Sequence, residues 1–266
     1  MPLPQPTPDA RAVITGASSG IGERLAHELA QRGHSLMLVA RRVDKLETLA
    51  EQLQTEHGVT VDLRPCDLTD REARATLREE LANQTVSVLC NNAGFATFGK
   101  LWKSDPERER QEVELNVAAV QDLTMAVLPG MVSRGAGAVL IVGSTAGIQP
   151  LPGAATYSAT KAFANTFSEA IHSELQGTGV TCTLLAPGPV HTEFMQAANV
   201  PKAEHQVPGW AWLTADQVAR SAVAGLENGQ RTVVPGALAK LFLHSGRHTP
   251  RSLLLPLVRR TLNRIG

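Results

Sequence analysis

Short apolar runs alternate with longer amphipathic segments along the 266-residue chain. Most of these runs are continuously apolar, which is typical of strands covered on both faces. Helical patterns separate them, and parallel strands need such crossovers. The expected strands lie at 11–15, 35–40, 60–63, 86–90, 138–142, 180–185 and 231–234. The pattern predicts one α/β domain over 10–236, built on a Rossmann-like, doubly wound parallel sheet with helices on both faces.

Capping patterns mark where several of the expected helices begin. A serine, threonine or aspartate followed three residues later by Glu or Gln fits a capping box. A proline at the first helical position strengthens such a start. The capping-box pairs are Asp44 with Glu47, Thr69 with Glu72, and Thr214 with Gln217, and Asp105 precedes Pro106.

A glycine-rich turn follows the first expected strand and leads into a helical pattern at 23–32. Residues 15–22 read TGASSGIG. Glycines let the backbone turn tightly and approach a pyrophosphate, which then lies at the N-terminus of the helix. The alternative is a turn that serves only strand–helix packing. The predicted phosphate-binding residues are Gly16, Ser18, Ser19, Gly20, Ile21 and Gly22.

Two arginines end the second expected strand, about 20 residues after the glycines. An acid at this place binds the ribose 2′-hydroxyl of NAD, whereas arginine accommodates the 2′-phosphate of NADP. Arg41 and Arg42 therefore favour NADP, with NAD as the second possibility. Asp44 is better explained as a helix cap. The alternative for the arginines is a solvated surface pair.

A tyrosine and a lysine four residues apart share one face of an expected helix. Tyr157, the one tyrosine of the chain, precedes Lys161. A nearby cation lowers the pKa of a tyrosine, whose usual value near 10 is too high for acid–base work at neutral pH. Ser144 follows the strand at 138–142, at the edge where ligands bind in such sheets, and its hydroxyl could bind a reacting oxygen.

Taken together, these motifs resemble those of the short-chain dehydrogenase/reductase (SDR) family. The resemblance covers about 11–235 and rests on the turn at 15–22, Asn91 to Gly94, Asn116, Ser144, the Tyr157–Lys161 pair and Pro187-Gly188. It implies a single-domain fold with seven strands in the order 3-2-1-4-5-6-7. It also implies hydride transfer between NAD(P)H and a carbonyl or alcohol, by homodimers or homotetramers.

The resemblance also implies a role for each matching residue. Tyr157 would exchange a proton with the substrate oxygen, Ser144 would orient that oxygen, and Asn116 would position a water in a proton relay. Lys161 would hold the nicotinamide ribose and lower the pKa of Tyr157. The remaining cofactor contacts would come from Asp67, Leu68, Asn92, Ala93, Gly94, Pro187, Gly188, Val190 and Thr192.

Aromatic side chains gather in two segments that follow strands at the expected ligand-binding edge. Aromatic residues make up only 4% of the chain, so their clustering suggests a small apolar carbonyl or alcohol substrate. An equally weighted alternative is that they close the core beneath a long loop. The candidate substrate contacts are Phe95, Phe98, Phe194, Met195 and Trp210. His191 is expected to lie on the surface or to line the substrate site.

Charge and cysteine content narrow the remaining possibilities. Acidic and basic residues number 25 each, which does not favour nucleic acid as a partner. The three cysteines lack metal-ligand spacing, so free thiols in the cytoplasm and no metal are expected. A proline-rich leader occupies 1–9, and a basic extension, 237–266, could pack on the fold, on a second subunit or weakly on a membrane. A dinucleotide-binding sensor without turnover is the main rival, and an SDR enzyme at a membrane acting on lipid-like substrates is another.

Overall fold

The computed structural model describes residues 3–194, 209–237, 239–241, 252 and 255–256. Its main sheet has seven strands, all parallel, in the order β3-β2-β1-β4-β5-β6-β9. The strands are β1 Arg11–Thr15, β2 Leu36–Ala40, β3 Val61–Pro65, β4 Val86–Asn91, β5 Gly137–Val142, β6 Val180–Leu185 and β9 Thr232–Val233. The predicted strands and their spatial order are confirmed, with β9 as the seventh strand of the sheet.

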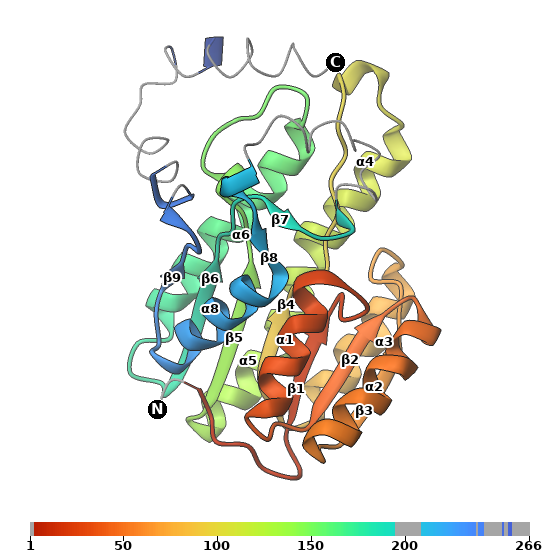
Figure 1. Cartoon of the computed structure of the whole chain (residues 1–266), viewed down its shortest axis with the longest axis vertical. Helices are drawn as coiled ribbons and strands as arrows, with labels where there is room; N and C mark the ends of the chain where they lie inside the picture. Colours follow the sequence, from red (N-terminus) through yellow and green to blue (C-terminus); the bar gives the residue numbers. More distant parts are fainter. Residues whose placement is uncertain (1–2, 195–208, 238, 242–251, 253–254, 257–266) are drawn as a thin grey trace.

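Helices cover both faces of this sheet (Figure 1). On one face, α1 (Gly20–Gln31) lies beside α2 (Val43–His57) and α8 (Ala215–Glu227). On the other face lie α3 (Arg71–Ala82), α5 (Val120–Arg134) and α6 (Ala155–Glu174). Each face therefore has its own apolar core, as a doubly wound fold requires.

Successive residues of each central strand serve the two cores in turn. Ile14 and Leu38 pack in the core beneath α1, α2 and α8. Val13 and Met37 point to the opposite face and pack beneath α3, α5 and α6. All four are fully buried. This alternation explains why the strands are apolar at every position rather than at every second one.

The predicted helix starts are confirmed in two cases and wrong in two. Thr214 forms the capping box with Gln217, and Asp105 accepts a hydrogen bond from the Glu107 N–H with Pro106 next to it. Asp44 is not a cap, because α2 already begins at Val43. Its carboxylate instead lies in the first helical turn, where the helix dipole favours it.

The start of α3 is shifted by one residue from the prediction. Asp70 is the cap, and its carboxylate accepts hydrogen bonds from the N–H groups of Glu72 and Ala73. Thr69 is not the cap, and its hydroxyl donates to Asp67 at 2.7 Å. Aspartate caps a helix at least as well as threonine, so the second of two adjacent candidates starts the helix.

A long helical segment crosses the second face and is not uniform. It comprises α4 (Pro106–Val113), a π-helical stretch η2 (Glu114–Ala119) and α5. By length and composition alone, 106–134 could also cross a membrane, a property shared with core helices of soluble proteins. Leu123, Val127 and Met131 of this segment are buried against the sheet, which accounts for its apolar character.

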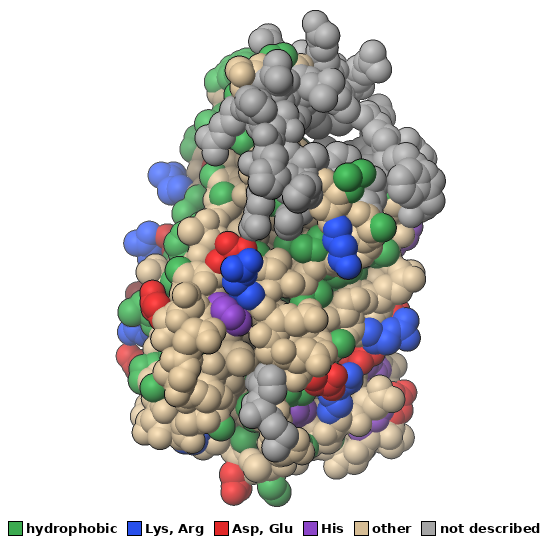
Figure 2. Space-filling view, turned by 90° about the vertical axis from the view of Figure 1, so that its left-hand side faces the viewer, with side chains coloured by type: hydrophobic (Ala, Val, Ile, Leu, Met, Phe, Trp, Pro, Cys, Tyr) green, Lys and Arg blue, Asp and Glu red, His purple; other side chains and the backbone are tan. Residues whose placement is uncertain are grey.

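A second, two-stranded sheet was not predicted. It pairs β7 (Val190–His191) with β8 (Leu213–Thr214), which follows the short helix η5 (Gly209–Ala211). Two-residue strands leave almost no periodic signal in a sequence. The leader at 1–9 and the basic extension at 237–266 stay predictions, and most of the extension lies outside the described residues. On the face shown in Figure 2, acidic and basic side chains of the described residues are intermixed.

Candidate active site

One cleft runs along the carboxyl ends of β1, β2, β4, β5 and β6, at the edge of the sheet where β7 lies (Figure 1). Its volume is about 1780 Å³, well above the roughly 300–1,000 Å³ of a single small-molecule pocket. It can therefore hold a dinucleotide and a second molecule side by side. All predicted site residues that the structure describes line this cleft except two. The two exceptions are Gly22 and Asn116. Met195 and the side chain of Trp210 lie outside the described residues.

Gly16 and Gly22 of the glycine turn lie too close to neighbouring atoms to carry a side chain. Gly16 has φ of +66°, and a Cβ on Gly22 would lie 2.3 Å from the Gly16 carbonyl oxygen. Asn92 also holds the turn, since its Nδ2 donates to the Thr15 carbonyl at 2.9 Å. The Thr15 hydroxyl accepts the backbone N–H groups of Asn92 and Ala93. These hydrogen bonds join the loop after β1 to the loop after β4 at the base of the cleft.

The N-terminus of α1 is open toward the cleft. Ser19 is its N-cap residue but makes no side-chain hydrogen bond to the first turn. Its hydroxyl instead accepts from Arg42 Nη2 at 2.8 Å. The first-turn N–H groups and the helix dipole are therefore placed to bind an anion. Together with the glycine turn, these donors fit the pyrophosphate of a dinucleotide.

Arg42 lies next to this phosphate-sized site. Its guanidinium also donates to the Ser18 hydroxyl, and its Nη1 forms an ion pair with Glu193 Oε2 at 2.9 Å. Arg42 therefore connects the glycine turn with the segment after β7, which is 151 positions away. Glu193 was not predicted as a site residue, and no local pattern marks it.

Arg41 is the more exposed of the two arginines, with 69% of its side chain accessible. Its Nη1 lies 3.7 Å from Asp67 Oδ2. Burial acts to raise the pKa of Asp67, but hydrogen bonds from Thr69 and the charge of Arg41 outweigh it, and the pKa falls below its usual value. Both arginines, Asp67 and Leu68 line the same end of the cleft.

Tyr157 lies at the other end of the cleft between two aromatic rings. The ring centroid of Phe98 is 6.3 Å away and that of Phe194 is 5.7 Å away. Desolvation among these groups raises the pKa of Tyr157 to about 12, although a hydrogen bond with Ser144 lowers it. The predicted fall in this pKa is therefore not found, because desolvation and the charge of Glu112 outweigh the hydrogen bond with Ser144.

Lys161 is buried, one helical turn after Tyr157. Its Nζ donates to the Val142 carbonyl at 2.8 Å and lies 6.0 Å from the centroid of the Tyr157 ring. Burial lowers the pKa of Lys161 to about 8, which places its proton loss near physiological pH. This hydrogen bond to the backbone holds the side chain of Lys161, which lines the cleft. An ammonium group has three donors, so one bond does not use all of them.

Ser144 caps a short 3-10 helix, η3 (Thr145–Gly147), directly after β5. Its hydroxyl accepts the Ala146 N–H at 3.0 Å. Asn165, one turn after Lys161 on α6, forms two hydrogen bonds with the backbone of Ser144. Its Nδ2 donates to the Ser144 carbonyl, and its Oδ1 accepts the Ser144 N–H. Sequence reasoning missed Asn165, whose one usable signal is its i+4 spacing from Lys161.

Asn116 lies in the π-helical stretch η2 and does not reach the cleft surface. Its Oδ1 accepts the Phe95 N–H, and its Nδ2 donates to the Phe95 carbonyl at 2.8 Å and to the Thr160 hydroxyl at 3.1 Å. Asn116 therefore ties the loop after β4 to α6. A role in a water-mediated proton relay stays a prediction.

Three of the predicted substrate residues line the cleft: Phe95, Phe98 and Phe194. The Phe95 ring is buried beneath the guanidinium of Arg108, 3.8 Å from its centroid. His191 is exposed and stacks on Trp212, with ring centroids 4.7 Å apart. The alternative that these aromatics only close a core therefore applies in part to Phe95, whereas Phe98 and Phe194 face Tyr157.

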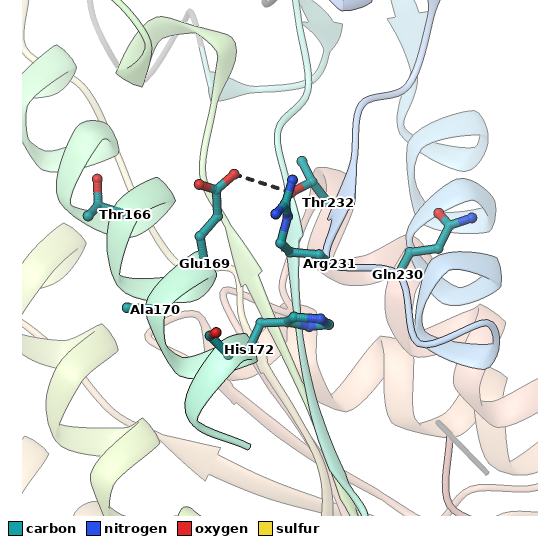
Figure 3. A pocket seen from close by; sticks show the side chains of 8 residues that line it. Thr166, Glu169, Ala170, His172, Gln230, Arg231 and Thr232 are labelled. Atoms are coloured by element: carbon teal, nitrogen blue, oxygen red, sulfur yellow. Dashed lines mark hydrogen bonds between the residues drawn. The ribbon is translucent and has the colours of Figure 1, made fainter. Parts of the chain in front are cut away.

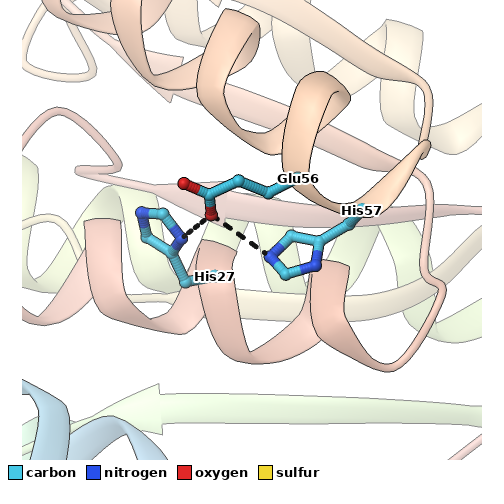
Figure 4. Close-up of side chains that lie close together, drawn as sticks. All are labelled: His27, Glu56 and His57. Carbon is cyan, nitrogen blue, oxygen red and sulfur yellow. Dashed lines mark ion pairs between the residues drawn. The ribbon is translucent and has the colours of Figure 1, made fainter.

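Two further features lie apart from this cleft. A shallow hollow between α6 and residues 230–232 shares no lining residue with the cleft (Figure 3). On the outer side of α1 and α2, His27 and His57 each lie 3.7 Å from Glu56 Oε2 (Figure 4). In the part of the chain that is described, this is the one cluster with metal-ligand chemistry, and none of its members lines the cleft.

Comparison with known proteins agrees with this geometry. The profile of the short chain dehydrogenase family matches residues 10–203. Sulfoacetaldehyde reductase of Chromohalobacter salexigens is 41% identical over 186 residues, which cover 68% of this chain and 72% of that protein. Very-long-chain 3-oxoacyl-CoA reductase of Bos taurus is 33% identical over 187 residues, 69% of this chain. The match spans about 60% of the bovine protein.

Solved structures match over nearly the whole chain. A short-chain dehydrogenase from Sphingobium yanoikuyae in complex with NADPH has a TM-score of 0.82 at 32% identity, covering 93% of this chain and 95% of that one. The bulky-bulky ketone specific alcohol dehydrogenase of Comamonas testosteroni has a TM-score of 0.77 at 28% identity, covering 97% and 95%. The chain therefore belongs to the short-chain dehydrogenase/reductase family of NAD(P)-dependent oxidoreductases acting on CH–OH groups.

Proposed function

We propose that this protein is an NADP(H)-dependent oxidoreductase that interconverts an apolar ketone or aldehyde and the corresponding alcohol. One observation carries the proposal: Tyr157 stands in the cleft with Ser144 at its hydroxyl, Lys161 one turn away and two phenylalanine rings beside it. These groups provide a proton donor, a holder for a substrate oxygen and an apolar wall in one place.

Tyr157 acts as the acid in the reductive direction. Its pKa of about 12 means that it carries its proton at neutral pH and can donate it to a carbonyl oxygen. Ser144 holds that oxygen, and Lys161 holds the ribose of the cofactor. When bound, the nicotinamide supplies or accepts the hydride. The tyrosine takes the proton back when the alcohol is oxidised.

Arginine chemistry supports NADP over NAD. Arg42 is already fixed by the Ser18 and Ser19 hydroxyls beside the glycine turn, so little side-chain freedom is lost when it binds a phosphate. Arg41 adds a second cation at the same end of the cleft. The Sphingobium yanoikuyae structure named above contains NADPH, which is consistent with this choice.

The lining of the cleft favours an apolar substrate. Phe98 and Phe194 flank Tyr157, and Leu151 and Trp212 also line the cleft. The relatives differ in the substrates that their names state, from sulfoacetaldehyde to very-long-chain 3-oxoacyl-CoA. The substrate class is therefore argued from the lining of this cleft rather than from the relatives.

We also propose a homo-oligomer formed through the helices that carry Asn116 and Lys161. Val113, Met125 and Val132 on the segment 106–134 are exposed by 44%, 62% and 41% of their surface. Apolar side chains exposed along one segment are typical of a contact surface. Sedimentation of the purified protein would give the mass, and a monomer at all concentrations would contradict this proposal.

A panel of apolar ketones and aldehydes tests the proposed activity. Wild-type protein is mixed with each compound and NADPH, and loss of NADPH fluorescence is followed. We expect turnover with bulky apolar carbonyls and slower turnover with small charged ones. NADPH binding without turnover of any compound would favour the rival, a dinucleotide-binding sensor. Cosedimentation with lipid vesicles, with and without residues 238–266, tests the membrane-associated alternative.

A further inference from the structure

A fully buried glutamate lies one helical turn before Asn116. Glu112, on α4, has no solvent-exposed surface. Its Oε2 accepts two hydrogen bonds from Thr97, one from the backbone N–H at 2.8 Å and one from the hydroxyl at 2.5 Å. Its Oε1 is buried without a hydrogen-bond partner among the described residues. A buried carboxyl group with one oxygen lacking a hydrogen bond lowers the stability of the fold, so a role for Glu112 beyond stability is worth seeking.

The neighbouring acid on the same segment shows what an ordinary ion pair looks like here. Glu114 lies two residues further on and is paired with Arg74, at 2.8 Å, and with Arg71. These partners hold the pKa of Glu114 below its usual value. Glu112 has no arginine partner among the described residues. Its hydrogen bonds come from Thr97, and its helix packs against α6.

The titratable groups that face Glu112 come from two elements. Lys161 and Tyr157 lie on α6, which packs against α4, and Glu109 lies one turn earlier on α4 itself. The loop that carries Thr97 contributes hydrogen bonds to Glu112. Its one charged residue, Lys100, lies over the Trp102 ring, and Arg108, one turn before Glu112 on α4, lies over the Phe95 ring. A negative charge on Glu112 raises the pKa of Lys161, opposing the desolvation that lowers it to about 8, and it also raises the pKa of Tyr157.

We propose that Glu112 is a positioning residue of the catalytic centre, which keeps Lys161 in its cationic form and fastens the loop after β4 beside Tyr157. The inference rests on the proposed function, because it gives Lys161 and Tyr157 their catalytic roles. The loop contact is direct: Thr97 is held by Glu112, and Phe98, the next residue, packs against the Tyr157 ring.

The charge on Glu112 is itself dependent on pH. Burial raises its pKa to about 7, and Glu109 adds to this, while Thr97 and Lys161 oppose it. Below that pH Glu112 is neutral and has no effect on Lys161. Above it Glu112 is ionised and delays the loss of the Lys161 proton. Removing the charge should therefore act only on the alkaline side of the pH profile.

Glu112→Gln tests this, since glutamine keeps an oxygen for Thr97 but carries no charge. The Lys161 Nζ resonance, assigned by comparison with Lys161→Arg, is followed by NMR as a function of pH. We expect the pKa of Lys161 to fall by about half to one unit in the variant. Glu107→Gln, an exposed glutamate on the same helix, is the control with the same charge change and should leave the titration unchanged.

Ketone reduction gives the second readout. Glu112→Gln should match wild type about one pH unit below 7, where Glu112 is already neutral, and should lose activity earlier as the pH rises. Glu112→Leu, which also removes the hydrogen bonds to Thr97, should raise KM at every pH.

An unchanged Lys161 titration would overturn the inference, whether or not the enzyme reduces any ketone. A lower pKa of Lys161 in Glu112→Gln, together with no ketone turnover by the wild-type protein, would count against the proposed function alone. Equal activity losses of Glu112→Gln at all pH values would show a structural role only and would also overturn the inference.

Discussion

Replacing Arg42 by alanine should weaken NADPH binding while leaving NADH binding nearly unchanged. The guanidinium is held beside the glycine turn by Ser18 and Ser19, so it can meet a 2′-phosphate without rearrangement. A charge-assisted contact of this kind contributes about 1.5–3 kcal/mol. The side chain is 42% exposed, and solvent screening reduces that value to about 1–2 kcal/mol. The dissociation constant for NADPH should therefore rise by about 5–30-fold.

Fluorescence titration with NADPH and with NADH separately measures this without a substrate. Arg78→Ala, an exposed arginine on α3 outside the cleft, is the matched control. Arg41→Ala should have a smaller effect, because that side chain is 69% exposed. Equal weakening of NADPH and NADH by Arg42→Ala would refute the reasoning, because it would mean that Arg42 supports the turn rather than reading the phosphate.

Three other variants test neighbouring parts of the account. Glu193→Gln removes the carboxylate that competes for the same guanidinium, and NADPH affinity should rise up to about fivefold in the same titration. Gly22→Ala places a Cβ 2.3 Å from a backbone oxygen and should lower the free energy of unfolding by about 1–3 kcal/mol in urea, whereas Gly209→Ala, whose Cβ meets no atom of the described residues within 4 Å, should not. Asn165→Ala releases the backbone of Ser144 and should lower kcat by about 10–100-fold with NADPH affinity unchanged.

The sequence predicts the sheet well because its signal is local and repeated. Seven strand-like runs separated by helical patterns fix the class, and the two cores follow from central strands that are apolar at every position. Helix starts are harder, because adjacent residues compete for the cap, as Thr69 and Asp70 do. The pair β7–β8 is too short to leave a pattern.

Within the candidate site, residues with motif spacing were predictable, whereas Asn165 and Glu112, which support them, were not. Tyr157, Lys161 and Ser144 have motif spacing, and all three line the cleft. Asn165 and Glu112 act through hydrogen bonds to segments about 15–21 residues away in the chain, which no local pattern reveals. The pKa of Tyr157 also depends on desolvation by its surroundings in the fold, which spacing does not report.

The central claim is that Tyr157 carries the proton in a carbonyl reduction at this cleft. Tyr157→Phe removes the hydroxyl and leaves the ring between Phe98 and Phe194. The most direct measurement is NADPH oxidation by wild type and Tyr157→Phe with the best ketone of the panel, alongside NADPH titration of both. The account predicts that the variant binds NADPH as wild type does and loses at least about 100-fold in kcat. Turnover by Tyr157→Phe at the wild-type rate would contradict it.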